Sequence, residues 1–173
     1  MKLQPRVNKT DHLHGNLDAP IELVEYGDYQ CPHCGRAYPI VKSIQRKMGN
    51  KLKFVFRNFP LAEMHPDATR AAVAAEIAAS QGKFWEMHDI IFENQEDLDD
   101  ESLIRYAAEI ELDMQKLNSD FQKPEFMEKV ENDFESGVRS GVNGTPSFFI
   151  NGEKYNDSWE ENQFLKHLQS FLK

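Results

Sequence analysis

The stretch Tyr26-Gly27-Asp28-Tyr29-Gln30-Cys31-Pro32-His33-Cys34 decides the fold, and it holds the only two cysteines of the 173-residue chain. An apolar run from Ile21 to Tyr26 precedes the cysteines, and a helical pattern from Ala37 to Met48 follows them. This order predicts a buried strand that delivers Cys31 to the start of a helix. Pro32 would take the first helical position, where its missing N–H costs nothing.

The position of Cys31 predicts a reactive thiol. A helix start supplies unpaired backbone N–H groups and the positive end of the helix dipole, and both favour a thiolate over a thiol. A cationic His33 would add a second favourable charge. We therefore expect the pKa of Cys31 to be lowered, so that the thiol reacts near neutral pH.

Two other interpretations of the cysteine pair are less favoured. Two unrelated thiols at a helix start would leave the preceding strand and a later Thr145-Pro146 loop unexplained. A structural zinc site needs four ligands, usually with a second cysteine pair. The chain has no third cysteine, so we expect no metal and no cofactor other than a redox-active Cys31–Cys34 disulfide. The histidines outside the motif lack ligand spacing: His12, His14, His65, His88 and His167.

Two motifs far apart in the chain together point to a family. Cys31-Pro32-His33-Cys34 follows an apolar strand, and Gly144-Thr145-Pro146-Ser147-Phe148-Phe149-Ile150 precedes the C-terminus. With this pair of motifs the chain resembles the DsbA-like thiol–disulfide oxidoreductases of the thioredoxin superfamily, from about Asp11 to its end. The resemblance implies an α/β thioredoxin fold with an inserted all-helical subdomain. We expect one domain over 1–173, with thioredoxin-fold parts at about 15–65 and 141–173 and the insertion at about 66–140.

Composition is that of an ordinary globular domain, with 40% hydrophobic and 28% charged residues and a net charge of −9. An acidic chain without a basic run is a poor candidate for binding nucleic acid, and no apolar stretch is long enough for membrane insertion. Met1 to Asn16 contains no apolar segment of a secretory signal. We therefore expect a cytoplasmic protein if the chain is complete, and an exported one if a signal has been removed.

The rest of the chain fits this architecture. Met1 to Leu13 is polar and is expected to form a surface loop, Pro39 is expected to kink the first helix, and residues 51–59 alternate as a strand with Leu52, Phe54 and Phe56 on one face. Helices are predicted at 68–79, 83–94, 100–110 (capped by Asp100), from Asp113, and at 124–139. Trp85 and His88 are interpreted as core or boundary residues. Residues 147–150 and 153–155 predict a hairpin with a protective edge lysine, before a helix at 160–173.

The resemblance also implies roles for residues outside the cysteine pair. It implies that Glu25, at the end of the apolar strand, is a partly buried acid that exchanges a proton with Cys34 through water. From the residues alone, a strand-end glutamate reaching solvent is equally plausible. The resemblance further implies a cis bond before Pro146 and a Thr145 backbone that pairs with an extended substrate strand beside Cys31.

We therefore expect a thiol–disulfide oxidoreductase in which Cys31 attacks and Cys34 resolves, while the Pro32-His33 pair sets the redox poise. Its partners would be protein or peptide thiols and disulfides, with an unidentified redox partner. Other functions remain possible at this point: a peptide-binding module without turnover, a glutathione-dependent transferase or isomerase of the same fold, and metal carriage by the two cysteines. Turnover of a dithiol or disulfide substrate would separate them.

Overall fold

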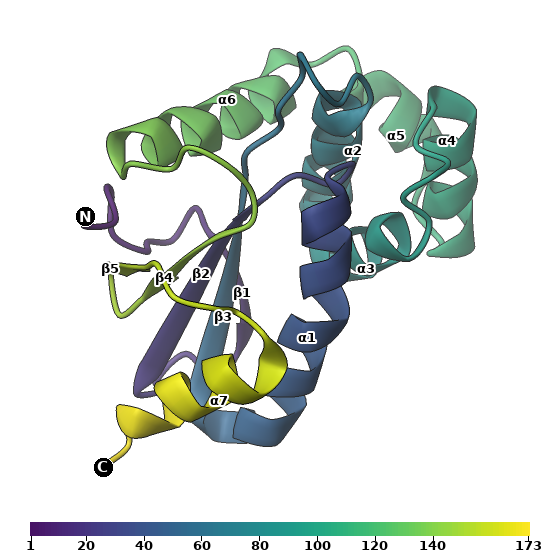
Figure 1. Cartoon of the computed structure of the whole chain (residues 1–173). Coiled ribbons are helices and arrows are strands. Elements are labelled where there is room, and N and C mark those ends of the chain that lie inside the picture. Colours follow the sequence, from purple (N-terminus) through teal and green to yellow (C-terminus); the bar gives the residue numbers. More distant parts are fainter.

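The structure, a computed structural model, describes residues 1–173 and is built around a five-stranded sheet (Figure 1). The strands are ordered β1-β3-β2-β4-β5, with β2 and β3 parallel and the other neighbours antiparallel. Because β2 is central and buried on both faces, its sequence is almost continuously apolar. The strands are β1 (His12–Gly15), β2 (Ile21–Gly27), β3 (Leu52–Asn58), β4 (Ser147–Ile150) and β5 (Glu153–Tyr155).

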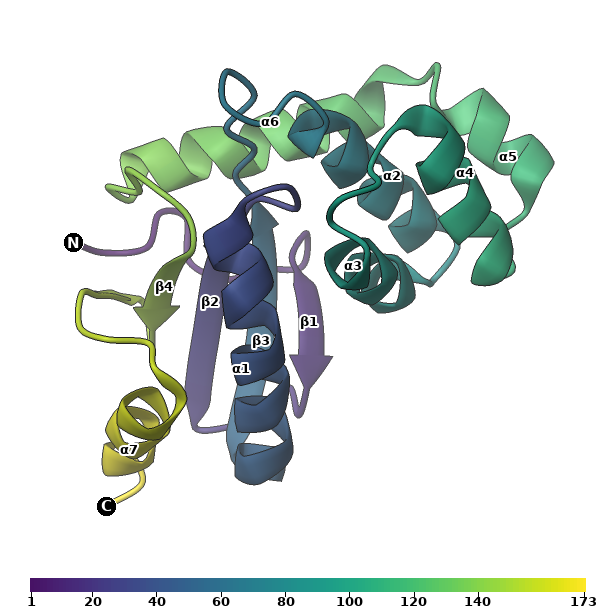
Figure 2. The same cartoon turned by 45° about the vertical axis from the view of Figure 1, so that its right-hand side comes forward.

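Helix α1 (Pro32–Met48) leaves the end of β2 and returns through one 3-10 turn (Gly49–Lys51) to β3, which completes a β-α-β unit. Figure 2 shows α1 in front of β2 and β3. Helix α7 (Glu161–Ser170) packs on the same side, where the ring of Phe164 lies 4.9 Å from that of Phe148. The predicted order of strand, helix and strand is thus confirmed, and Pro39 lies inside α1 as expected.

Five helices lie between β3 and β4 in the chain, beside and above the sheet (Figure 2). As predicted, Asp113 caps α5 by accepting a hydrogen bond from Lys116 N at 3.0 Å, and Pro124 opens α6. The cap of α4 is Asp99, which accepts from Ser102 N at 2.8 Å, and not Asp100 as predicted. The five are α2 (Ala68–Ser80), α3 (Phe84–Glu93), α4 (Asp100–Glu109), α5 (Met114–Asp120) and α6 (Pro124–Arg139).

The apolar core has two parts, one on each face of the sheet. On the face of α1, the side chains of Phe54 and Phe56 join a cluster that extends into the inserted helices. On the other face, Val55 packs with a smaller cluster that α6 reaches through Phe134. This alternation along β3 confirms the predicted pattern, and each fully buried side chain of this size stabilises the fold by roughly 1.5–3 kcal/mol. His88 is buried and Trp85 half-buried, as interpreted.

The expectation of a surface loop up to Leu13 is wrong in its last residues. His12–Gly15 forms β1, which pairs antiparallel with β3 from His12 opposite Phe56 to Gly15 opposite Lys53. The backbone groups at the edge of β3 need partners, and β1 supplies them. A buried ion pair fixes the start of this strand, because Arg57 Nε donates to Asp11 Oδ1 at 2.7 Å. None of the helices is both long and apolar enough to cross a membrane.

Candidate active site

The two cysteines lie at the junction between the end of β2 and the start of α1. Cys31 is the N-cap residue of α1 and has an extended backbone (φ −70°, ψ 123°), while Pro32 occupies the first helical turn. This is the predicted arrangement, in which the unpaired N–H groups of the helix start surround the Cys31 sulfur. Both cysteines are free thiols and both are buried, Cys31 with 4% and Cys34 with 0% of its surface exposed, while Pro32 and His33 are exposed beside them.

The surroundings of Cys31 favour its thiolate. They lower its pKa to about 5, chiefly because the Cys34 thiol can donate a hydrogen bond to it, and burial opposes this effect. The Thr145 side chain and the backbone N–H groups of Cys34 and His33 lower the pKa further. His33 thus contributes a backbone N–H, whereas the sequence suggested a contribution from its imidazole. Cys31 is therefore suited to act as a nucleophile at neutral pH.

Cys34 has the opposite character. Its side chain is fully buried, and Asp28 N lies 3.4 Å from its sulfur as a hydrogen-bond donor. Burial raises the pKa of Cys34 well above its usual range, and its hydrogen bond to Cys31 adds to this effect. At neutral pH the pair therefore consists of one thiolate and one buried thiol that holds its proton.

Thr145 brings a distant part of the chain to the cysteine pair. The Thr145–Pro146 peptide bond is cis, as the resemblance implied, and the carbonyl oxygen of Thr145 lies 3.6 Å from Cys31 Sγ. The Thr145 hydroxyl is buried and has no hydrogen-bond partner within the reduced protein. It is therefore free to turn toward a Cys31 thiolate, consistent with its effect on the pKa of Cys31.

Glu25 lies below the cysteines on β2, and its side chain is buried rather than directed to solvent. Burial and, to a smaller extent, the charge of Cys31 together raise the pKa of the Glu25 carboxyl to about 8. No hydrogen bond or cation offsets the burial. Glu25 also contributes to the raised pKa of Cys34, which indicates that the two groups interact. A carboxyl group with these properties can take up or release a proton near neutral pH.

Asp28 is a residue of the site that the sequence interpretation missed. Its buried carboxylate accepts hydrogen bonds from Gln30 N (2.8 Å) and Cys31 N (3.1 Å) through one oxygen, and from Leu61 N (2.8 Å) through the other. The ring of His65 lies 2.8 Å from the second oxygen. Asp28 thus ties the cysteine loop to the segment after β3. Its position three residues before Cys31 is a sequence signal, because aspartate commonly accepts from N–H groups two and three residues on.

Gln95 is a second missed residue, and it connects the inserted helices to the motif. Its Nε2 donates to the carbonyl oxygens of Tyr29 (2.8 Å) and Cys31 (2.9 Å). Gly35, one turn into α1, leaves the space that the Gln95 amide occupies, since a Cβ at this position would overlap Gln95 Oε1. Nothing in the local sequence around Gln95 marks it, because its partners lie more than 60 residues away.

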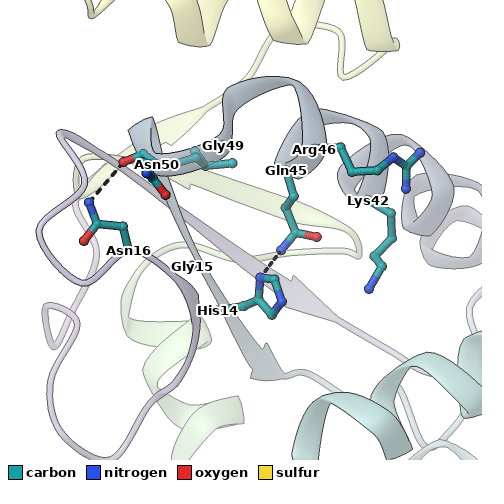
Figure 3. Close-up of a pocket in the computed structure, with 9 residues that line it drawn as sticks. His14, Gly15, Asn16, Lys42, Gln45, Arg46, Gly49 and Asn50 are labelled. Carbon is teal, nitrogen blue, oxygen red and sulfur yellow. Dashed lines mark hydrogen bonds between the residues drawn. The ribbon is translucent and has the colours of Figure 1, made fainter.

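A large hollow lies away from the cysteines, at the far end of α1 (Figure 3). It measures about 770 Å³, and no cysteine lines it. We call it the polar hollow, because only one of its nine lining residues is hydrophobic: His14, Gly15, Asn16, Lys42, Gln45, Arg46, Gly49, Asn50 and Leu52. No group of three or more His, Cys, Asp or Glu side chains is placed to hold a metal ion.

Relatives in sequence are longer proteins. The chain is 37% identical over 170 residues to a protein named Na⁺/H⁺ antiporter NhaA 1 from Mycobacterium sp. strain KMS, a match that covers 97% of this chain and 28% of that protein. A protein named Na⁺/H⁺ antiporter NhaA from Herminiimonas arsenicoxydans is 39% identical over 161 residues, which cover 92% of this chain and 25% of that protein. The chain therefore spans about a quarter of the length of these relatives.

Solved structures and a family model agree on the fold. A thioredoxin-like oxidoreductase from Silicibacter pomeroyi superposes with a TM-score of 0.83 at 26% identity, over 94% of this chain and 92% of that one. Oxidised BdbD from Bacillus subtilis gives a TM-score of 0.82 at 24% identity, over 95% of this chain and 94% of that one. Wolbachia pipientis α-DsbA1 gives a TM-score of 0.82 at 22% identity, over 95% of this chain and 92% of that one. The model of the thioredoxin family matches residues 7–172, and the chain therefore belongs to this family, with a DsbA-like form of the thioredoxin fold.

Proposed function

We propose that this protein is a thiol–disulfide oxidoreductase that exchanges disulfides with protein or peptide thiols. The observation that carries the proposal is the opposite effect of the site on its two cysteines, which lowers the pKa of Cys31 and raises that of Cys34. Exchange requires one thiolate that attacks and a second thiol held within reach to resolve the product. The proposal rests on this chain's own cysteine pair, and not on the names of its longer relatives.

In this proposal Cys31 is the attacking residue. Its thiolate attacks a sulfur of a substrate disulfide, the substrate S–S bond breaks, and one substrate sulfur leaves as a thiolate. Cys34 then loses its proton and attacks the Cys31 sulfur of the mixed disulfide. The Cys31–Cys34 bond forms and the second substrate thiolate leaves, so that the substrate is reduced and the protein oxidised. Disulfide donation is the same sequence in reverse.

Substrates would dock beside Cys31 at the half-buried Thr145. Its carbonyl oxygen faces Cys31, and its N–H and C=O would pair with an extended peptide whose sulfur meets Cys31. Because pairing through backbone groups does not depend on the side chains of the substrate, we expect the site to accept many protein thiols. This broad acceptance separates the proposal from a glutathione-dependent transferase, which would prefer one small thiol.

The preferred direction would be disulfide donation. A site that stabilises the Cys31 thiolate stabilises the reduced form, which makes the oxidised form a stronger oxidant. Equilibration with glutathione should therefore give a reduction potential well above the value of about −270 mV for thioredoxin, in the range of about −200 to −120 mV. A potential near that of thioredoxin would make the protein a reductant.

Trapping of mixed disulfides tests the proposed roles. Cys34→Ala should accumulate a mixed disulfide with a cysteine-containing peptide through Cys31, detected by mass spectrometry, while Cys31→Ala should accumulate none. Equal trapping by both variants would contradict the assignment of roles. If the wild-type protein exchanges no disulfide with either a peptide or glutathione, the redox function itself is wrong and a binding module becomes the better interpretation.

A further inference from the structure

We propose that the proton exchanged between Cys34 and Glu25 enters and leaves the protein through a narrow internal cavity that meets the polar hollow at a gate formed by His14, Lys42 and Gln45. The inference rests on the proposed redox function and adds a route to it. It assigns a role to the far end of α1, which the thiol chemistry itself does not use.

The first observation is the internal cavity. Glu25 lines a narrow space between the sheet, α1 and α3 that accommodates about one water molecule. Apolar side chains form about half of its wall, and polar groups form the rest. The residues around it are His14, Glu25, Tyr38, Val41, Lys42, Gln45, Phe54, Trp85, His88, Asp89 and Phe92. The cavity therefore places polar side chains from β1, α1 and α3 beside the buried carboxyl of Glu25.

The second observation is that the cavity and the polar hollow share three residues. His14, Lys42 and Gln45 line both spaces, so they form the partition between the buried carboxyl and the surface. Figure 3 shows these three side chains from the side of the hollow. Gln45 Nε2 lies 3.3 Å from His14 Nδ1, a long contact between two side chains that are not deeply buried. We call these three residues the gate.

The third observation is a buried nitrogen without a partner. His88 lines the cavity, its Nδ1 lies 3.0 Å from Asp89 Oδ1, and its Nε2 is buried without a hydrogen-bond partner in the protein. A buried polar atom of this kind normally binds a water molecule. Asp89 in turn accepts a hydrogen bond from Lys42 Nζ at 2.6 Å, so that polar contacts continue from His88 to the gate.

The charged and titratable groups around Glu25 come from several elements, while the neighbouring strands β3 and β4 place Phe56 and Phe148 opposite it. Tyr38 and Lys42 lie on α1, His88 and Asp89 on α3, His14 on β1, Tyr29 on the loop between β2 and α1, and Cys31 and Cys34 at the start of α1. Only Lys42 and a protonated histidine could be positive, and Lys42 is already paired with Asp89. No fixed cation therefore holds Glu25 ionised, which leaves its carboxyl free to take up a proton from Cys34 and pass it on.

The chemistry balances in each direction. During resolution the Cys34 thiol gives its proton to Glu25, the Cys34 thiolate attacks Cys31 in the mixed disulfide, and the substrate sulfur leaves with the electron pair. The proton on Glu25 then passes through the cavity and the gate to solvent. In disulfide donation Cys34 leaves as a thiolate and takes a proton from Glu25, which is reprotonated by the same route. A substrate docked at Thr145 covers the other side of the pair, so a rear exit keeps proton exchange possible.

A pH-jump experiment tests the route. The mixed disulfide of Cys31 with a small thiol is prepared at acid pH, where Cys34 holds its proton, and its resolution is followed after a rapid jump to neutral pH. Gln45→Leu replaces the polar gate with an apolar one, and His14→Ala removes its imidazole. The control is Arg46→Gln, which lines the polar hollow but not the cavity. Each rate is measured in H2O and D2O, with initial attack by Cys31 measured separately.

We expect Gln45→Leu and His14→Ala to slow resolution of the mixed disulfide by about threefold to tenfold. This is smaller than the roughly 10²–10⁴-fold rate enhancement that a positioned acid–base group contributes. The solvent isotope effect should rise in both, and added imidazole, a diffusible proton carrier, should restore the rate of His14→Ala. Attack by Cys31 and the behaviour of Arg46→Gln should match the wild type. Wild-type resolution and isotope effects in both gate variants, or equal slowing by Arg46→Gln, would overturn the route while leaving the redox function intact. Absence of any mixed disulfide in the wild type would instead refute the redox function.

Discussion

The rim of the site and its floor differ in how far their buried polar groups are hydrogen-bonded. At the rim, formed by Asp28, Cys31 and Gln95, hydrogen bonds from several elements hold the cysteine loop in place. On the floor, formed by Glu25, Cys34 and His88, the carboxyl of Glu25 has no compensating hydrogen bond and His88 Nε2 has no partner. Two buried carboxyl groups three residues apart, one on β2 and one just after it, thus have different surroundings.

The difference separates positioning from proton exchange. A carboxylate that accepts hydrogen bonds from several fixed donors holds the backbone in place, as at Asp28. A carboxyl group that is buried without such donors has a raised pKa and changes its protonation state near neutral pH, as at Glu25. The rim therefore fixes where Cys31 lies, and the floor controls when Cys34 can react.

The first prediction concerns the rim and removes the carboxylate of Asp28. Asp28→Ala leaves the N–H groups of Gln30 and Leu61 without their acceptor and leaves Cys31 N with only the carbonyl oxygen of residue 28, and hydrogen bonds to a charged group are each worth about 1.5–3 kcal/mol. We expect urea unfolding at pH 7 to show a loss of about 3 kcal/mol or more. Asp28→Asn should lose less, because one amide oxygen still accepts while the NH2 group faces a donor.

Asp18, an exposed aspartate before β2, provides the control for Asp28. Asp18→Ala should change the free energy of unfolding by no more than about 0.5 kcal/mol. A loss below about 1 kcal/mol in Asp28→Ala would contradict the view that the rim depends on this carboxylate.

The second prediction concerns the floor of the site and uses the variant Glu25→Gln. The folded pKa of Glu25 is about 8, above the value of about 4.3 for a free glutamate. A carboxyl group whose pKa is raised in the folded state stabilises the fold fully below about pH 4. This contribution to the free energy of unfolding falls as pH rises toward 8, by up to about 1.4 kcal/mol per pH unit. Glu25→Gln removes this loss. The reduced variant should therefore match the wild type near pH 4 and become more stable than it by pH 8, as measured by denaturant unfolding across this range.

The same variant should be less active. Without the carboxyl group Cys34 loses its proton acceptor, so resolution of the mixed disulfide should slow by roughly 10²-fold while attack by Cys31 changes little. A variant that is more stable at pH 8 and yet resolves at the wild-type rate would show that Glu25 is buried without a role in proton exchange.

The third prediction compares the reduced and oxidised proteins. The folded pKa of Cys31 is about 5, below the value of about 8.5 for a free thiol, so its thiolate contributes stability that is complete above about pH 8.5 and fades as pH falls through 5. The disulfide form lacks this contribution. Thermal melts at pH 7 should therefore show the reduced protein to be more stable, by about 2 kcal/mol once solvent access to Cys31 is allowed for.

The pH dependence checks the cause of this difference. The gap between the two melting temperatures should narrow as pH falls from 7 to 5. His33→Ser retains the backbone N–H that lowers the pKa of Cys31, so it should reduce the gap only slightly. A more stable oxidised form at pH 7 would mean that the pair is a reductant.

The sequence predicted the parts of the site that depend on local patterns. The apolar run of β2, the proline after Cys31 and the spacing of the cysteines each follow from local backbone preferences, and the structure confirms this placement. The cis bond at Pro146 and the burial of Glu25 came from the family resemblance, and both are observed. The roles of Glu25 and Thr145 in the reaction stay predictions.

The parts that escaped prediction depend on contacts between distant segments. The four residues of β1 show little apolar alternation, and only the free edge of β3 makes them a strand. Gln95 has no local signal because its acceptors belong to the cysteine loop. The cavity beside Glu25 arises where α1, α3 and β1 meet, which no single stretch of sequence describes.

The smallest expected effect concerns the fit of Gly35 against Gln95. Alanine is preferred over glycine inside a helix by about 1 kcal/mol, so Gly35→Ala should stabilise α1 if nothing opposed it. Here the new methyl group would displace the Gln95 amide from the carbonyl oxygens of Tyr29 and Cys31, and each lost hydrogen bond costs about 0.5–1.5 kcal/mol. We therefore expect Gly35→Ala to be neutral or destabilising by about 1 kcal/mol in the wild type.

In a Gln95→Ala background the methyl group meets no amide, so Gly35→Ala should stabilise the protein by about 0.5–1 kcal/mol. A double-mutant cycle of urea unfolding measures this change of sign as a coupling energy of about 1–2 kcal/mol. Equal effects of Gly35→Ala in both backgrounds would mean that Gln95 does not hold the cysteine loop. In that case Asp28 alone would secure the rim, and the inserted helices could move without disturbing Cys31.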